Sequence, residues 1–223
     1  DRRGNVEPAS LIYVLAGVTD LSAEPLPDEQ LIAAARLEPM PSYGVPKTDS
    51  HDAGLITLSR PLAFGAGVTS AKVTGTGAAA TALAPDDPLQ VSGWGSTYPD
   101  GSDPGSAVLK AATINYVSDA ACPGEFLDTD LAADLDPGTM LCAIAPDTDS
   151  CFGDSGGPLT TPPPGNVLVG LVSWGPPSCG GYEGPGVYTE LAEPTLNAFV
   201  RGPHIVGLDG PLRGAPGDAA TFV

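Results

Sequence analysis

The sequence predicts an all-β fold built from two units and closed by a short C-terminal helix. Short runs of strand-forming residues recur between turns, and the chain contains 29 glycines and 25 prolines, the residues that most often end strands. Apolar residues make up 42% of the 223 residues, enough for a substantial core. A stretch at residues 75–85 has no charge and few large side chains, and it separates the runs into two sets.

The first set predicts a unit over residues 1–82. Its expected strands lie at residues 11–18, 31–37, 55–58 and 68–74. The second of these runs contains three alanines, so a helix is also possible there. The third run stops at Arg60-Pro61, because proline cannot donate to a strand ladder.

The second set predicts a unit over residues 83–202. Its expected strands lie at residues 89–95, 107–117, 167–174 and 186–191, and residues 193–200 form a short amphipathic helix. Residues 203–223 carry strand-like ends around a Gly/Pro-rich middle. We expect them to be a linker or the start of an appended β-sandwich domain, with a disordered tail as an equal alternative.

Net charge and the length of the apolar runs exclude some classes of binding partner. The net charge is −18 with only nine Lys and Arg, which argues against nucleic acid as a partner. An acidic surface suits a solvated secreted protein or attraction of basic substrates. The longest apolar run near the N-terminus has eight residues, too few to span a bilayer, so no membrane partner is expected. The chain begins with polar residues rather than a signal peptide, which we interpret as processing or as a piece of a longer protein.

Four cysteines are present and none forms a CxxC pair, which disfavours zinc and thioredoxin-type chemistry. Three disulfide pairings are possible. We expect the local one, Cys122–Cys142 with Cys151–Cys179, which closes two moderate loops worth about 3 kcal/mol each. Such bonds indicate an oxidising, extracellular location. No loop of the D-x-D-x-D-G type is found, so we predict neither a metal nor a cofactor.

Ser155 is the candidate nucleophile, in the segment Asp149-Ser150-Cys151-Phe152-Gly153-Asp154-Ser155-Gly156-Gly157-Pro158-Leu159. Glycines on both sides let consecutive N–H groups turn toward one point beside the hydroxyl, as an oxyanion requires. The segment also satisfies G-x-S-x-G, the nucleophile elbow of α/β-hydrolases. That fold needs a helix directly after the serine, and Pro158 with the prolines at 162–164 excludes it.

Three further segments accompany this box in a fixed order. They are Ser92-Gly93-Trp94-Gly95, Val172-Ser173-Trp174-Gly175 and Pro185-Gly186-Val187-Tyr188-Thr189. With the serine box, their order and spacing resemble the trypsin-like (chymotrypsin-family) serine proteases over residues 14–202. The resemblance implies two antiparallel six-stranded β-barrels, the first one incomplete here, with the active site in the cleft between them.

The resemblance also implies roles for single residues. Ser155 would be the nucleophile, and the N–H groups of Gly153 and Ser155 the oxyanion hole. Asp52 would orient the catalytic histidine; the neighbouring Asp49 fits that place less well. Asp149 would lie at the base of the specificity pocket and pair with a substrate Arg or Lys, with Asp147 as an alternative alignment. The remaining substrate-binding positions would be Ser150, Ser173, Trp174, Gly175 and Gly186.

The histidine that the resemblance requires is absent from its expected place, upstream of residue 11. His51 and His204 are the two histidines of the chain. His51 adjoins Asp52 on an expected extended segment, so the two side chains should point to opposite faces, and we interpret both histidines as exposed. The family also has an aspartate that pairs with a new amino terminus, the place of Asp154, but Asp1-Arg2-Arg3 does not resemble that terminus. We therefore expect a fragment that lacks the catalytic histidine.

Two functional hypotheses follow. The first is a secreted serine endopeptidase, bacterial and monomeric, that cleaves polypeptides after Arg or Lys and is inactive as the chain stands. The alternative is a non-catalytic protease homologue that binds peptides or proteins in its cleft. A catalytic histidine in the complete protein would distinguish the first from the second.

Overall fold

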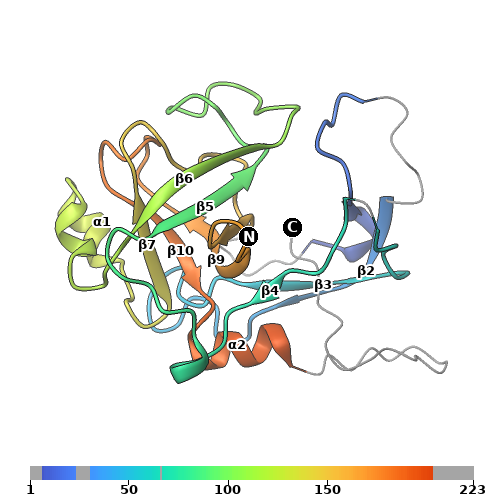
Figure 1. Ribbon diagram of the computed structural model, residues 1–223, viewed down its shortest axis with the longest axis horizontal. Coiled ribbons are helices and arrows are strands. Elements are labelled where there is room, and N and C mark those ends of the chain that lie inside the picture. Colours follow the sequence, from blue (N-terminus) through green and yellow to red (C-terminus); the bar gives the residue numbers. More distant parts are fainter. Residues whose placement is uncertain (1–6, 24–30, 66, 203–223) are drawn as a thin grey trace.

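The computed structural model describes residues 7–23, 31–65 and 67–202, and it contains two β-sheets with few helices (Figure 1). The larger sheet is built from β5 (Pro88–Gly93), β6 (Lys110–Val117), β7 (Met140–Ile144), β8 (Pro158–Thr160), β9 (Val167–Trp174) and β10 (Gly186–Glu190). Neighbouring strands pair antiparallel in the order β5-β6-β7-β10-β9-β8, and β8 pairs with β5. The sheet is therefore a closed six-stranded barrel.

The barrel is filled by side chains from all its long strands. Leu89, Ile114 and Leu159 are fully buried in one cluster with the ring of Tyr188. Strand β9 is buried almost throughout, because it is covered on both faces. On its outer face Leu168 and Leu171 pack against residues of the C-terminal helix.

The first sheet has three antiparallel strands, β1 (Tyr13–Leu15), β2 (Leu31–Pro39) and β3 (Gly54–Leu58). Val14 and Ile32 point into its buried face, and Tyr13 and Leu31 point outward, as the period of two requires. The alanines of β2 therefore lie in a strand and the helix alternative was wrong. Strand β1 is shorter than predicted, because a 3-10 turn, η1 (Ala9–Leu11), precedes it.

The strand predicted at residues 68–74 was wrong in its length and in its partner. The run at 68–74 contributes only β4 (Lys72–Val73), which pairs parallel with β9 of the barrel rather than with the first sheet. The stretch at 75–85 contains a 3-10 turn, η3 (Gly77–Ala79). The domain boundary between residues 82 and 83 stays a prediction.

The expected C-terminal helix is present as α2 (Pro194–Arg201). Glu193 caps it by accepting a hydrogen bond from the Leu196 N–H at 2.6 Å, and proline occupies the first turn, where no donor is needed. Leu196 and Val200 are buried. Residues 203–223, with His204 and the predicted sandwich strand, and the N-terminal Asp1-Arg2-Arg3 lie outside the described residues.

Six elements of the described residues were not predicted: β7, β8, the 3-10 turns η1, η3 and η4 (Cys122–Glu125), and α1 (Thr129–Ala133). Strand β7 is a short apolar run without alternation, and β8 is a three-residue segment that begins with proline. Cys122–Cys142 joins η4 to β7, and Cys151–Cys179 joins the serine segment to the loop before β10. The prediction of these two local disulfide pairs is therefore confirmed.

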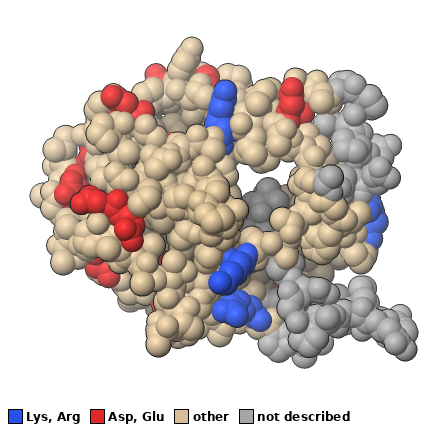
Figure 2. Space-filling model, in the orientation of Figure 1, with Lys and Arg blue, Asp and Glu red and all other residues tan. Residues whose placement is uncertain are grey.

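The surface charge is unevenly distributed. On the face shown in Figure 2, acidic side chains gather over the barrel, and Lys and Arg lie nearer the first sheet. No helix within the described ranges is long and apolar enough to cross a membrane.

Candidate active site

The loop that carries Ser155 is held against β9. Gly156 N–H donates to the Val172 carbonyl at 2.8 Å, and Val172 N–H donates back to the Gly157 carbonyl at 2.9 Å. Gly153 and Gly156 have φ values of 96° and 80°, a backbone region that side-chain-bearing residues rarely adopt. The sharp turn leaves Ser155 exposed at the surface of a rigid barrel.

The same loop arranges backbone donors near the hydroxyl. Asp154 N–H donates to the Cys151 carbonyl at 2.9 Å, and Gly157 N–H donates to the Asp154 carbonyl at 2.8 Å. The N–H groups of Gly153 and Ser155 have no acceptor within the described part of the chain. They are therefore available to an anion that forms beside Ser155.

The side chain of Asp154 points into the protein, whereas that of the neighbouring Ser155 is exposed. Its carboxylate accepts hydrogen bonds from Gly95 N–H at 2.8 Å and from Cys151 N–H at 2.9 Å. A Cβ at Gly93 or Gly95 would collide with this carboxylate, so both positions require glycine. A cavity of about 240 Å³ is bounded by both Asp149 and Asp154.

Asp52 lies two residues before β3, and its carboxylate contacts a residue of the barrel. Ser173 Oγ donates to Asp52 Oδ2 at 2.6 Å, and Thr189 Oγ1 donates to the Asp52 carbonyl at 2.5 Å. Ser173 follows Val172, whose backbone holds the Ser155 loop. Asp52 and Ser155 therefore pack against the same end of β9.

Asp149 is a largely buried carboxyl group in the loop before Ser155. It accepts a hydrogen bond from Ser150 N–H at 2.8 Å. Burial raises the pKa of Asp149 to about 6, although the bonds from Ser150 and Gly180 oppose that shift. The alternative Asp147 is exposed. Asp149 is therefore the better candidate for the base of a pocket.

Glycines and a tyrosine surround this carboxyl group. A Cβ at Gly186 would lie 2.7 Å from Asp149 Oδ1 and 2.9 Å from Tyr188 Oη, and a Cβ at Gly175 would face Gly186 at 3.8 Å. Tyr188 Oη and Ser150 Oγ lie 3.0 Å apart. The missing side chains leave room beside an anionic group, which suits a long cationic ligand.

Trp174, predicted to contact substrate, packs on Phe126 with ring centroids 5.9 Å apart. Its indole N–H is buried and has no hydrogen-bond partner within the described residues. Thr189 and Tyr188 were not predicted as site residues, although both belong to a motif that was noticed. The sequence did contain a signal for them, because Tyr188 and Thr189 follow Gly186 by two and three residues in a predicted strand. The period of two places Tyr188 on the same face as Gly186.

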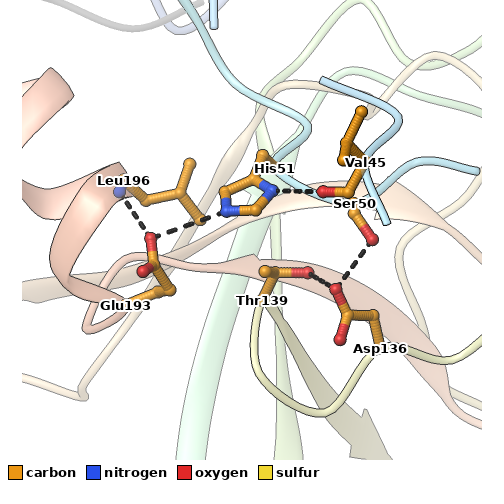
Figure 3. Close-up of polar contacts among 7 residues, drawn as sticks. All are labelled: Val45, Ser50, His51, Asp136, Thr139, Glu193 and Leu196. Carbon is orange, nitrogen blue, oxygen red and sulfur yellow. Dashed lines mark hydrogen bonds and ion pairs between the residues drawn. The ribbon is translucent and has the colours of Figure 1, made fainter. Parts of the chain in front are cut away.

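His51 does not lie as predicted. Its φ of 56° is left-handed rather than extended, and its side chain is only 14% exposed, so the interpretation as a surface residue was wrong. Nδ1 is 2.8 Å from the Val45 carbonyl and Nε2 is 3.8 Å from Glu193 Oε2 (Figure 3). Both ring nitrogens thus face groups other than Ser155.

Comparisons with known proteins agree on one family. The family model described as Trypsin matches residues 10–199. Trypsin-1 of Astacus astacus is 34% identical over 189 residues, 83% of this chain and 73% of that protein. Trypsin delta of Drosophila erecta is 37% identical over 158 residues, 69% of this chain and 55% of that protein.

A solved structure, that of neuropsin, a serine protease expressed in the limbic system of mouse brain, has a TM-score of 0.63 and 30% identity over 79% of this chain and 72% of that one. Human serine protease 56 is 34% identical over 171 residues, which cover 70% of this chain and only 25% of that protein. The chain thus spans about half or less of some relatives that it matches. These relatives are animal proteins and give no support to the predicted bacterial origin.

Proposed function

Because the chain belongs to the trypsin family of serine proteases, we propose that it is a secreted, monomeric serine endopeptidase that cleaves polypeptides after Arg or Lys. The observation that carries the substrate class is the Asp149 carboxyl group, largely buried next to Gly186 and Gly175. A buried carboxylate without a cationic partner is costly, and a substrate guanidinium or ammonium would supply that partner.

Hydrolysis would proceed through an acyl-enzyme on Ser155. Its Oγ attacks the carbonyl carbon and the oxyanion is held by the Gly153 and Ser155 N–H groups, which have no other acceptor in the described residues. Asp52, fixed by Ser173, would orient the histidine that takes the Ser155 proton. The protonated histidine gives this proton to the leaving amine as the C–N bond breaks, which releases the first product and leaves the acyl ester. Water, deprotonated by the same histidine, then attacks the ester, and Ser155 regains its proton as the second product leaves.

We propose that none of the described residues supplies the general base. His51 has one ring nitrogen at Val45 and the other near Glu193, so its ring is not directed to Ser155. His204 lies outside the described residues. As the family resemblance implies, we propose that the base is a histidine outside these 223 residues. The chain by itself is then expected to hydrolyse slowly, since a serine without its base loses most of the rate.

Asp154 has a separate proposed role in activation. Its carboxylate borders the cavity of about 240 Å³ and is held by two backbone N–H groups from Gly95 and Cys151. A protonated amino terminus that enters this cavity would pair with Asp154 and stiffen the loop carrying Gly153 and Ser155. The pairing would connect proteolytic processing with formation of the oxyanion hole.

The test compares the longest polypeptide that the gene encodes with the 223-residue chain, each on peptide amides that end in Arg, Lys or Phe. We expect the long form to hydrolyse the Arg and Lys amides, and Ser155→Ala to abolish that activity. Cleavage after Phe instead would refute the role of Asp149. If no form hydrolyses any amide but both bind Arg peptides through Asp149, the non-catalytic binding module is the better description.

A further inference from the structure

A polar junction joins residues 47–52 to the loop that precedes β7 (Figure 3). Ser50 is fully buried, and its Oγ donates to Asp136 Oδ2 at 2.8 Å. Lys47 Nζ donates to the carbonyls of Ala133 and Leu135 at 2.7 and 2.6 Å, at the end of α1. The segment before Asp52 is thus bonded to the barrel by side chains.

Asp136 is itself held in a fixed place. Thr139 Oγ1 donates to the same Oδ2 at 2.9 Å, and Thr139 and Met140 N–H groups donate to the Asp136 carbonyl. Glu190 N–H donates to the Thr139 carbonyl at 2.8 Å, which joins this loop to β10. Burial raises the pKa of Asp136, but the bonds from Ser50 and Thr139 outweigh burial and hold that pKa below its usual value. Asp136 is therefore an ionised acceptor on a rigid support.

The segment that it holds has an unusual backbone. Asp49 and His51, on either side of Ser50, have φ values of 62° and 56°, in the left-handed region. Asp and His tolerate that region better than most residues, but it still costs free energy relative to ordinary conformations. Hydrogen bonds within residues 43–50 support the turn, and the bond from Ser50 to Asp136 fixes it to the barrel. Asp52 follows at once, and its carboxylate must meet Ser173.

We propose that Asp136 is a positioning residue for Asp52, because its hydrogen bond with Ser50 fixes the turn from which Asp52 presents its carboxylate to the catalytic base. The role rests on the proposed function, in which Asp52 orients a histidine. The nearby His51–Glu193 contact is longer, at 3.8 Å, whereas Ser50–Asp136 is a hydrogen bond from the middle of the turn to the barrel, beside those that Lys47 makes to Ala133 and Leu135. The strand pairings that close the barrel do not include this bond, so its loss is expected to act on the turn before Asp52.

The test uses the longest polypeptide that the gene encodes and an Arg amide. Asp136→Ala should lower kcat about tenfold, since small misplacements of catalytic groups are expensive, and leave KM within about twofold. The acidic limb of the kcat profile should move to lower pH, because an ionised Asp52 no longer stabilises the protonated base. Asp136→Asn should restore most of the rate, since its amide oxygen still accepts from Ser50.

Two more variants isolate the bond. Ser50→Ala removes the donor and should match Asp136→Ala, and the double variant should be no slower than either single one. Asp134→Ala is the control, because Asp134 is exposed in the same loop and its carboxylate makes no hydrogen bond within the described residues. A KM effect without a kcat effect, or equal losses in Asp136→Ala and Asp136→Asn, would overturn the proposal.

Failure of the proposed function would be recognised separately. If the parent hydrolyses the Arg amide no faster than Ser155→Ala does, the protease hypothesis fails. The effect of the Ser50–Asp136 bond on the turn is then measured in the 223-residue chain. The Ala53 N–H donates to the His51 carbonyl at 2.8 Å, so its hydrogen exchange reports on the turn. At least tenfold faster exchange in Asp136→Ala, but not in Asp134→Ala, supports the positioning role, and unchanged exchange refutes it.

Discussion

Replacing Asp149 by asparagine tests the pocket without a substrate. Burial raises the pKa of the Asp149 carboxyl from 3.8 to about 6. A shift of about two pKa units corresponds to about 3 kcal/mol between the two protonation states. The ionised form of Asp149 therefore lowers the free energy of unfolding of the empty protein by about this amount.

The sign of the pH dependence follows from proton binding. Between pH 3.8 and about 6 the folded state holds more protons at Asp149 than the unfolded state does. The Asp149 contribution to stability therefore falls as pH rises through that window and is at its lowest above pH 6. The asparagine side chain of the variant does not titrate, and burial of its amide offsets part of the gain. We expect Asp149→Asn to be about 2 kcal/mol more stable than the parent at pH 8, a rise in Tm of about 4–8 °C. Near pH 3.5, where the parent carboxyl is protonated and only the cost of burying the amide remains, we expect the variant to be about 1 kcal/mol less stable than the parent.

Calorimetry of both proteins at pH 3.5, 5, 6.5 and 8 measures this difference. Benzamidine, a flat amidinium, should raise the Tm of the parent more at pH 8 than at pH 5, because it pairs with the ionised carboxyl, and it should not affect Asp149→Asn. Asp147→Asn is the matched control, an exposed acid in the same loop. A stability difference that is the same at every pH would refute the reasoning.

Four further changes have defined outcomes. Ser155→Ala should abolish hydrolysis of an Arg amide with Tm unchanged within about 1 °C, because the side chain is exposed. Gly186→Ala places a Cβ 2.7 Å from Asp149 Oδ1, so KM for Arg amides should rise at least tenfold while circular dichroism stays constant. Replacing both Cys151 and Cys179 by Ala opens a loop with a sequence separation of 28, which should lower the urea-unfolding free energy by about 3–4 kcal/mol. Burial raises the pKa of Glu190 to about 7, so stability should fall as pH rises from 4.5 to 7, and Glu190→Gln should remove that fall in calorimetric scans.

Strands with alternating or long apolar patterns could be predicted from the sequence, and α2 was predicted from its amphipathic pattern. Strand β9 has the bounds expected, because its eight residues are largely apolar and bordered by turns. The two missed strands lack such a signal. Strand β8 has three residues and begins with proline, and it exists because β5 and β9 pair with it on both sides. Its formation depends on tertiary contacts rather than on local preference.

The path of residues 47–52 was the largest error, and its cause is physical. Residues 45–53 contain no glycine, so nothing local indicates two departures into the left-handed region at Asp49 and His51. The turn is held partly by local side-chain bonds, such as Tyr43 Oη to Asp49 Oδ1 at 2.8 Å, and partly by bonds to residues about 86 positions away, such as Ser50 to Asp136. A nearest-neighbour pattern cannot report such contacts.

The glycines around Trp94 show how the motifs depend on one another. Along the chain, Ser92-Gly93-Trp94-Gly95 and the serine box are separate signals, with Gly95 and Asp154 separated by 59 positions. In the structure the Asp154 carboxylate occupies the space that side chains at Gly93 and Gly95 would need, and it accepts the Gly95 N–H. Asp154 in turn sets the direction of the peptide that carries the Gly153 and Ser155 donors. A side chain at Gly95 would therefore act on the proposed oxyanion hole through Asp154, so these two motifs form one structural unit rather than two independent signatures.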